Sequence, residues 1–106
     1  MRWVRYLPIF MVMLWGMISA PARAETIEVT ISQLVFSPAE VKAKVSDTIK
    51  WINKDIVAHT ATVRGKWDVM IAPNKSASLV LKNAGTFDYY CRIHPNMKGR
   101  ITVTAE

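Results

Sequence analysis

The segment YYCRIHPNMKG, residues 89–99, gathers three side chains that can bind a soft metal ion or react at a thiol. Cys91 is the only cysteine of the 106-residue chain, and His94 and Met97 follow it at intervals of three residues. A thiolate, an imidazole and a thioether can bind a metal, a thiolate beside an imidazole can act as a nucleophile with its base, and a lone thiol can be oxidised. The spacing alone leaves these three possibilities open.

His59, the other histidine of the chain, lies 32 residues before Cys91. In AHTATV, residues 58–63, His59 alternates with threonines and falls on the same face as Ala61, which we predict to be the core face. The same alternation in TFDYYC, residues 86–91, places Cys91 on the core side with Tyr89. A single inward histidine is more often a hydrogen-bonded core residue than a ligand, but here both histidines and the cysteine can meet at one end of the domain.

Two imidazoles and one thiolate, with a weak axial thioether from Met70 or Met97, form the ligand set of a blue-copper electron-transfer site. Structural zinc prefers four cysteine or histidine ligands, and covalent haem attachment needs two cysteines. A cysteine nucleophile needs a substrate cleft, which so small and loop-poor a chain does not obviously offer. We therefore favour copper, and keep a copper carrier, zinc binding and a redox thiol as alternatives.

The rest of the chain predicts the scaffold for these residues. Apolar and polar side chains alternate in short runs that are separated by turn-forming residues, and no segment has a helical apolar stripe. About seven strands at this spacing indicate an all-β, two-sheet β-sandwich. The predicted strands cover residues 26–31, 40–45, 48–53, 58–63, 76–82, 86–91 and 100–105. Tyr89, two residues before Cys91, is either a tyrosine corner or an ordinary core aromatic.

The first 24 residues differ from the remainder and are predicted to be a signal peptide. Two arginines precede an apolar run of 13 residues, 7–19, which is shorter than the roughly 20 residues that span a membrane. Ala22 and Ala24 fit the small-residue cleavage rule. Cleavage would leave residues 25–106 as a single periplasmic domain, with no membrane attachment.

Charge and size limit the function of that domain. The whole chain has a net charge of +6, and removal of the three leader arginines would leave 11 basic residues against 8 acidic ones. That excess is too small for a nucleic-acid-binding surface. A domain of about 80 residues has a small core and is often stabilised by a disulfide or a metal, and a single cysteine cannot form an internal disulfide.

The segments IKWINKD, NAGTFDYYC and CRIHPNMKG, together with His59, resemble the small periplasmic cupredoxins, and among them the amicyanin group. The resemblance covers nearly all of residues 25–106, and the two-residue gaps of CxxHxxM are typical of that group. The family commonly has asparagine where this chain has Thr60, and proline and phenylalanine where it has Ile93 and Asn96.

The resemblance implies a Greek-key β-sandwich that binds one copper ion, Cu(I) or Cu(II). His59 would be the N-terminal ligand, Cys91 the thiolate, His94 the ligand at the solvent edge and Met97 the axial ligand. It also implies a monomeric, non-enzymatic electron carrier in the periplasm. Its partners would be a dehydrogenase or a cytochrome, bound transiently. From their positions near His94, we expect Arg92, Lys98 and Arg100 to surround an apolar contact surface.

Overall fold

The computed structural model describes residues 23–105, which form nine β-strands. They are β1 (Thr26–Ser32), β2 (Val35–Ser37), β3 (Glu40–Lys44), β4 (Thr48–Asn53), β5 (His59–Val63), β6 (Trp67–Ile71), β7 (Ser76–Val80), β8 (Gly85–Tyr90) and β9 (Lys98–Thr104). Within residues 23–105, no helix has the length and apolar character needed to cross a membrane.

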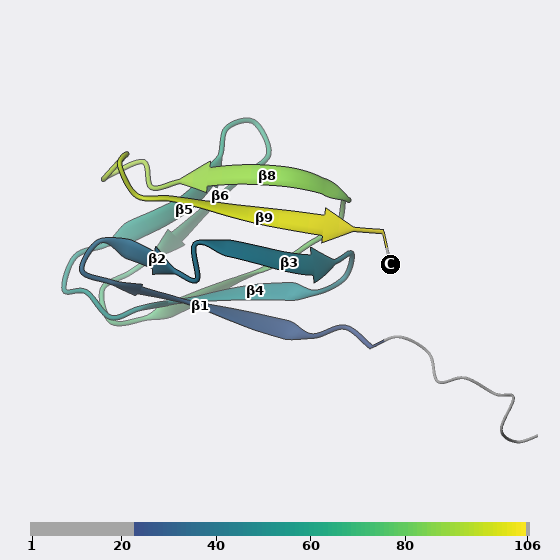
Figure 1. Cartoon of the computed structure of the whole chain (residues 1–106). Coiled ribbons are helices and arrows are strands. Elements are labelled where there is room, and N and C mark those ends of the chain that lie inside the picture. Colours follow the sequence, from purple (N-terminus) through teal and green to yellow (C-terminus); the bar gives the residue numbers. More distant parts are fainter. Residues whose placement is uncertain (1–22, 106) are drawn as a thin grey trace, which may run out of the picture.

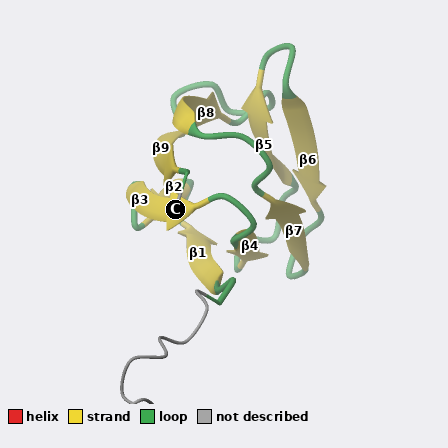
Figure 2. Cartoon of the chain, turned by 90° about the vertical axis from the view of Figure 1, so that its right-hand side faces the viewer, coloured by secondary structure: helices red, strands yellow, loops and turns green. Residues whose placement is uncertain are grey.

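The strands form two sheets that pack face to face (Figure 1). One sheet has the order β2-β1-β4-β7 and the other the order β3-β9-β8-β5-β6. The pairs β1–β4 and β3–β9 are parallel, and the other pairs are antiparallel. Figure 2 shows β6 and β7 next to each other where the two sheets meet at one edge. The arrangement confirms the predicted all-β sandwich.

The core contains the inward-facing side chains of both sheets, and its largest members are aromatic. Tyr89 packs edge-on against Phe36 and Trp51, with ring centroids 4.7 and 5.6 Å apart. The Trp51 indole N–H donates a hydrogen bond of 3.3 Å to the Tyr89 hydroxyl, and burial raises the pKa of Tyr89 to about 12. A tyrosine corner would bond to the backbone instead, so Tyr89 is a core aromatic.

Two strands were not predicted from the sequence, and both have a physical reason. β2 has three residues, too few for a periodic signal. In β6, Trp67, Val69 and Ile71 face inward, but Met70 faces outward and is about half exposed. An outward methionine next to Asp68 weakens the alternation that identifies a strand.

The outer face of β5 also differs from the prediction. Thr60 and Thr62 were predicted to lie on the face opposite the core, and both are nevertheless buried. Their hydroxyls lie beneath the side chain of Asp68 on β6 and the backbone of Arg92, with which they form hydrogen bonds. This covered face is next to the candidate metal ligands.

Near the start of the described residues, the backbone of Glu25 is held by a hydrogen bond to Asp47. Its backbone N–H donates to Asp47 Oδ1 at 2.9 Å, and the Lys44 backbone N–H donates to Asp47 Oδ2 at 2.8 Å. These two backbone hydrogen bonds lower the pKa of the buried Asp47 carboxyl below its usual value. The predicted leader falls mainly on residues 1–22, which lie outside the described residues.

Candidate metal centre

Three strand ends position the candidate ligands at one end of the sandwich. His59 is the first residue of β5, Cys91 directly follows β8, and Met97 directly precedes β9. His94 lies on the loop between β8 and β9, which is at the left end of the molecule in Figure 1. His59, Cys91 and Met97 are buried, whereas His94 is partly exposed.

The structure brings His59, Cys91 and His94 together with their ligand atoms within 4.8 Å of one another. Cys91 Sγ lies 3.8 Å from His59 Nδ1 and 4.0 Å from His94 Nδ1. The two imidazole rings are tilted by 60°, with centroids 5.1 Å apart. One sulfur and two nitrogens therefore face a common point.

The two separations from Cys91 Sγ are close to those of atoms that bind one metal ion. Bonds of about 2.3 Å to sulfur and about 2.0 Å to nitrogen place the two atoms about 3.7 Å apart at an angle of 120°, and about 3.5 Å apart at the tetrahedral angle. The observed distances of 3.8 and 4.0 Å are closer to the trigonal value. Two imidazoles and a thiolate in a plane, with the buried Met97 nearby in sequence, fit a type 1 copper site.

Asp55 orients the His59 ring. The His59 Nε2–H donates to Asp55 Oδ2 at 2.8 Å, because an ionised carboxylate can only accept. Burial alone would raise the pKa of Asp55, but the backbone N–H groups of Leu34 and Gln33 and the His59 ring together lower it. With its proton on Nε2, His59 presents the lone pair of Nδ1 toward Cys91, as a metal ligand must.

Asp55 also stabilises a strained turn. Gln33 and Leu34, between β1 and β2, have φ angles of 53° and 63°, a left-handed conformation that is uncommon for residues other than glycine. Both backbone N–H groups of this turn donate to the Asp55 carboxylate, at 2.7 and 3.1 Å. One side chain thus connects the β1–β2 turn to a candidate ligand.

Asn53 fixes the segment that leads to His59. The two protons of its buried amide Nδ2 serve three carbonyl oxygens, those of Val57, Ile71 and Ala72 at 2.8, 3.2 and 3.2 Å, so one proton is shared between two of them. Its Oδ1 accepts the backbone N–H of Asp55 at 2.9 Å. Neither Asn53 nor Asp55 was predicted to contribute to the site, although the spacing of four between Asp55 and His59 could have suggested their contact.

The Cys91 sulfur accepts two backbone hydrogen bonds. The N–H of Thr60 lies 3.3 Å from Sγ and the N–H of His94 lies 3.4 Å from it. The loop is closed by the Cys91 N–H, which donates to the Met97 carbonyl at 3.1 Å, and by the Met97 N–H, which donates to the His94 carbonyl at 2.9 Å. Hydrogen bonds to the thiolate and within the loop fix the sulfur from both sides.

Apolar and charged side chains flank His94 on the ligand loop. Ile93, directly before His94, is about half exposed, as is Met70 on the outer face of β6. Of the basic residues expected to surround the contact surface, two form ion pairs. Arg92 Nε lies 2.9 Å from Asp68 Oδ1, and Arg100 Nε lies 2.7 Å from an oxygen of Asp88. Their positive charge is therefore largely neutralised locally.

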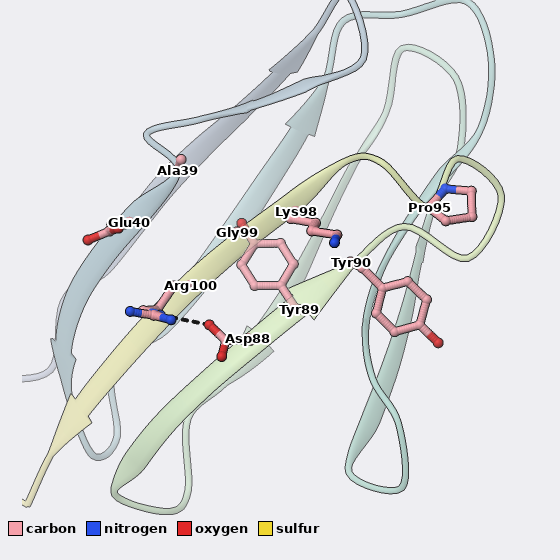
Figure 3. A pocket seen from close by; sticks show the side chains of 9 residues that line it. All are labelled: Ala39, Glu40, Asp88, Tyr89, Tyr90, Pro95, Lys98, Gly99 and Arg100. Carbon is pink, nitrogen blue, oxygen red and sulfur yellow. Dashed lines mark hydrogen bonds and ion pairs between the residues drawn. The ribbon is translucent and has the colours of Figure 1, made fainter.

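A groove of about 740 Å³ runs along β8 and β9 (Figure 3). Its lining extends from Ala39 and Glu40 to Pro95, and the ion pair between Asp88 and Arg100 crosses it. The buried Cys91 is not part of this lining. The groove therefore gives a substrate no route to the thiol.

A family model described as a cupredoxin-like domain matches residues 6–103. The chain belongs to the cupredoxin-like family. This family membership agrees with the two-sheet fold and with the cluster of His59, Cys91 and His94.

Curated relatives and solved structures place this cupredoxin near the amicyanins. It is 34% identical over 84 residues to amicyanin of Paracoccus denitrificans, a match that covers 73% of this chain and 64% of that relative. It is 32% identical over 89 residues to amicyanin-alpha of Methylorubrum extorquens, with 77% and 75% covered. Plastocyanin of Scenedesmus fuscus is 33% identical over 85 residues, with 66% and 87% covered.

The solved structures agree with the sequence relatives. A crystal structure of amicyanin from Paracoccus versutus superposes with a TM-score of 0.65 at 27% identity, covering 79% of this chain and 84% of the other. An oxidised proline-to-alanine variant of amicyanin superposes with a TM-score of 0.66 at 33% identity, covering 74% and 81%. The likeness to amicyanin therefore holds in both sequence and fold.

Proposed function

We propose that this cupredoxin is a blue-copper protein that carries single electrons between redox partners. The observation that supports the proposal most strongly is the convergence of Cys91 Sγ with the Nδ1 atoms of His59 and His94 at separations of 3.8 and 4.0 Å. Copper bound there would supply one-electron redox chemistry, Cu(I) to Cu(II). The relatives named amicyanin and plastocyanin support the same function.

The protein part of the mechanism is to hold the ligands in one geometry. His59 is held by Asp55, and Cys91 accepts two backbone hydrogen bonds. Ligands held in place by such contacts move little when the charge of the bound ion changes, which keeps the reorganisation energy of electron transfer small. Met97 is proposed as the axial ligand because it is buried and closes the loop, whereas Met70 is about half exposed.

His94 is proposed as the point where electrons enter and leave. It is the candidate ligand with partial solvent exposure, and its neighbours Ile93 and Pro95 are exposed. A small apolar surface allows a partner to approach the ring closely and to separate again. We propose a transient complex of the monomer with a periplasmic dehydrogenase or cytochrome, and no enzymatic role, since the buried thiol offers no access to a substrate.

Export and cleavage after Ala24 are also proposed. Glu25 would then be the first residue, and its backbone nitrogen already forms a hydrogen bond with Asp47 Oδ1. β1 begins one residue later, at Thr26. Loss of residues 1–24 would therefore remove none of the described strands. Mass spectrometry of the protein from a periplasmic fraction should give a mature chain that begins at Glu25, and a chain that retains residue 1 would contradict the proposal.

The visible and paramagnetic-resonance spectra of the protein loaded with Cu(II) test the function. We expect an intense blue colour that disappears in Cys91→Ser and persists, with a changed reduction potential, in Met97→Leu. A colourless protein that is stabilised by Zn(II) alone would refute the proposal. The alternative function, a copper carrier, predicts rapid loss of copper to a chelator. The buried ligands Cys91 and His59 favour slow loss instead.

A further inference from the structure

Four side chains outside the ligand set form one continuous hydrogen-bonded group beside Cys91. Thr60 and Thr62 lie on β5, Asp68 lies on β6, and Arg92 follows Cys91 on the ligand loop. The Arg92 backbone N–H is 2.8 Å from Thr60 Oγ1, and the Thr60 and Thr62 hydroxyl oxygens are 2.9 Å apart. Asp68 Oδ1 lies 2.6 Å from the Thr62 hydroxyl and 2.9 Å from Arg92 Nε. The group closes on itself, because Arg92 participates at both ends.

The direction of each hydrogen bond in the group is fixed because the Asp68 carboxylate can only accept and the Arg92 N–H groups can only donate. The pKa of Asp68 is lowered by its hydrogen bonds from the Arg92 guanidinium and the Thr62 hydroxyl, so its carboxylate accepts both. The Thr62 proton is then committed to Asp68, and the proton between the two hydroxyls must come from Thr60. The Thr60 oxygen in turn accepts the Arg92 N–H. The donors from the Arg92 N–H through Thr60 and Thr62 all point toward Asp68, and the Arg92 Nε–H reaches the same carboxylate from the other side. Hydrogen bonds in such a chain strengthen one another.

Thr60 connects this group to the sulfur. Its backbone N–H donates to Cys91 Sγ at 3.3 Å, while its hydroxyl accepts the N–H of the residue that follows Cys91. Thr60 is fully buried and Thr62 is nearly so. A buried hydroxyl without a partner is costly, so the Thr60 hydroxyl depends on Thr62, and the Thr62 hydroxyl depends on Asp68.

We propose that Thr60, Thr62, Asp68 and Arg92 form a latch that fixes the ligand loop against β5, with Asp68 as a positioning residue for Cys91. Asp68 contacts none of the candidate ligands and acts through the two hydroxyls and through Arg92. The inference rests on the proposed copper site for its effect on redox properties, but the hydrogen bonds of the latch do not involve a metal ligand side chain. The two claims can therefore fail separately.

The latch is tested by amide hydrogen exchange of the mature chain, measured with and without copper. The exchange rate of the Arg92 amide is divided by that of Ile101, which lies in the core strand β9 and reports global unfolding. Thr62→Val keeps the shape but removes the hydroxyl, and should raise this ratio about fivefold to tenfold, as expected for loss of a hydrogen bond. Thr62→Ser restores the hydroxyl and should return the ratio to the wild-type value.

Asp68→Ala has a matched control in Asp88→Ala. Asp88 also forms an exposed ion pair with an arginine, Arg100, on the same sheet, but its side chain forms no hydrogen bond with the ligand loop. Asp68→Ala should raise the exchange ratio of the Arg92 amide as Thr62→Val does, and Asp88→Ala should not. Equal ratios in the two alanine variants would overturn the proposal, as would equal ratios in Thr62→Val and Thr62→Ser.

The copper-loaded protein supplies a second readout. We expect Thr62→Val and Asp68→Ala to shift the reduction potential and the paramagnetic-resonance spectrum, and expect Thr62→Ser and Asp88→Ala to match the wild type. If the wild type is not blue but its exchange ratios behave as stated, the proposed function fails and the latch stands. If the wild type is blue and Thr62→Val is unchanged in both potential and exchange, the latch fails and the function stands.

Discussion

Replacing Asp55 with alanine is expected to lower the free energy of unfolding of the metal-free protein by about 3 kcal/mol. The substitution removes the acceptor of three hydrogen bonds, from the backbone N–H groups of Gln33 and Leu34 and from His59 Nε2. The first two N–H groups lie in an exposed turn and can bond to water instead. The His59 ring is fully buried, and its nitrogen would lose its partner.

The magnitude follows from these three environments. Each exposed N–H bond contributes about 0.5 to 1 kcal/mol net, and an unpaired buried donor costs about 1 to 3 kcal/mol. The left-handed turn at Gln33 and Leu34 also loses the carboxylate that offsets its conformational cost. The total loss of stability from these three contacts is therefore well above the effect of removing an exposed ion pair, which is about 0 to 1 kcal/mol.

Urea unfolding of the metal-free protein measures this loss. With a slope of about 1 kcal/mol per molar urea for a small domain, the midpoint should fall by about 2 to 3 M. Asp88→Ala is the control, because it removes an exposed ion pair to Arg100 and no buried contact. If Asp55→Ala and Asp88→Ala have the same midpoint, the stabilising role assigned to Asp55 is wrong.

Asp55→Asn separates stability from metal binding. Asparagine keeps one oxygen that can accept the Gln33 N–H. Its amide nitrogen takes the place of the oxygen that accepts from Leu34 and His59, and so offers protons to His59 Nε2. That contact favours the tautomer with the proton on Nδ1, the atom that faces Cys91. We therefore expect a smaller loss of stability than in Asp55→Ala, together with copper binding about 10- to 100-fold weaker in a chelator competition. Wild-type affinity in this variant would contradict the assigned tautomer.

Three further predictions follow from other contacts. Because backbone hydrogen bonds lower the pKa of Asp47 in the folded state, its contribution to stability is present above about pH 4 and is lost as the pH falls below that value. Asp47→Asn should therefore be less stable at neutral pH and show a weaker loss between about pH 4 and 2 in acid titrations followed by circular dichroism. Gly99→Ala should destabilise the fold by about 1 to 3 kcal/mol in thermal melts, because the added carbon would overlap the buried Tyr89 ring. Electron transfer to an acidic partner should slow only modestly as salt rises, since Asp68 and Asp88 neutralise two arginines near the ligand loop, and a steep salt dependence in stopped-flow rates would contradict this.

The alternation of apolar residues was sufficient to predict the fold class, but not every strand. β1, β4 and β9 each bury alternate side chains and were predicted nearly to their ends. β6 was missed because Met70 places an apolar side chain on the outer face. Which strands pair in parallel, such as β3 with β9, depends on contacts between residues far apart in sequence, which a local pattern does not contain.

Part of the candidate site could likewise be predicted from the sequence and part could not. Residue type and spacing were enough to select His59, Cys91 and His94, because few side chains have their chemistry. Asp55 and Asp68 could not be assigned a role, since an aspartate in a turn or on a strand surface has no distinguishing local signal. Their functions depend on distances across the fold, from Asp55 to His59 and from Asp68 to the ligand loop.

The parallel pairing of β3 with β9 also affects the time before Cys91 is protected. Glu40 lies opposite Arg100, so the chain must close a loop of about 60 residues before β9 is in place. Sandwiches with such distant pairings fold in milliseconds to seconds, more slowly than helical proteins. During that interval the thiol, fully buried in the native state, is exposed to oxidants and to other thiols. The strand order that builds the metal centre therefore also leaves the thiol unprotected until the last strand has paired.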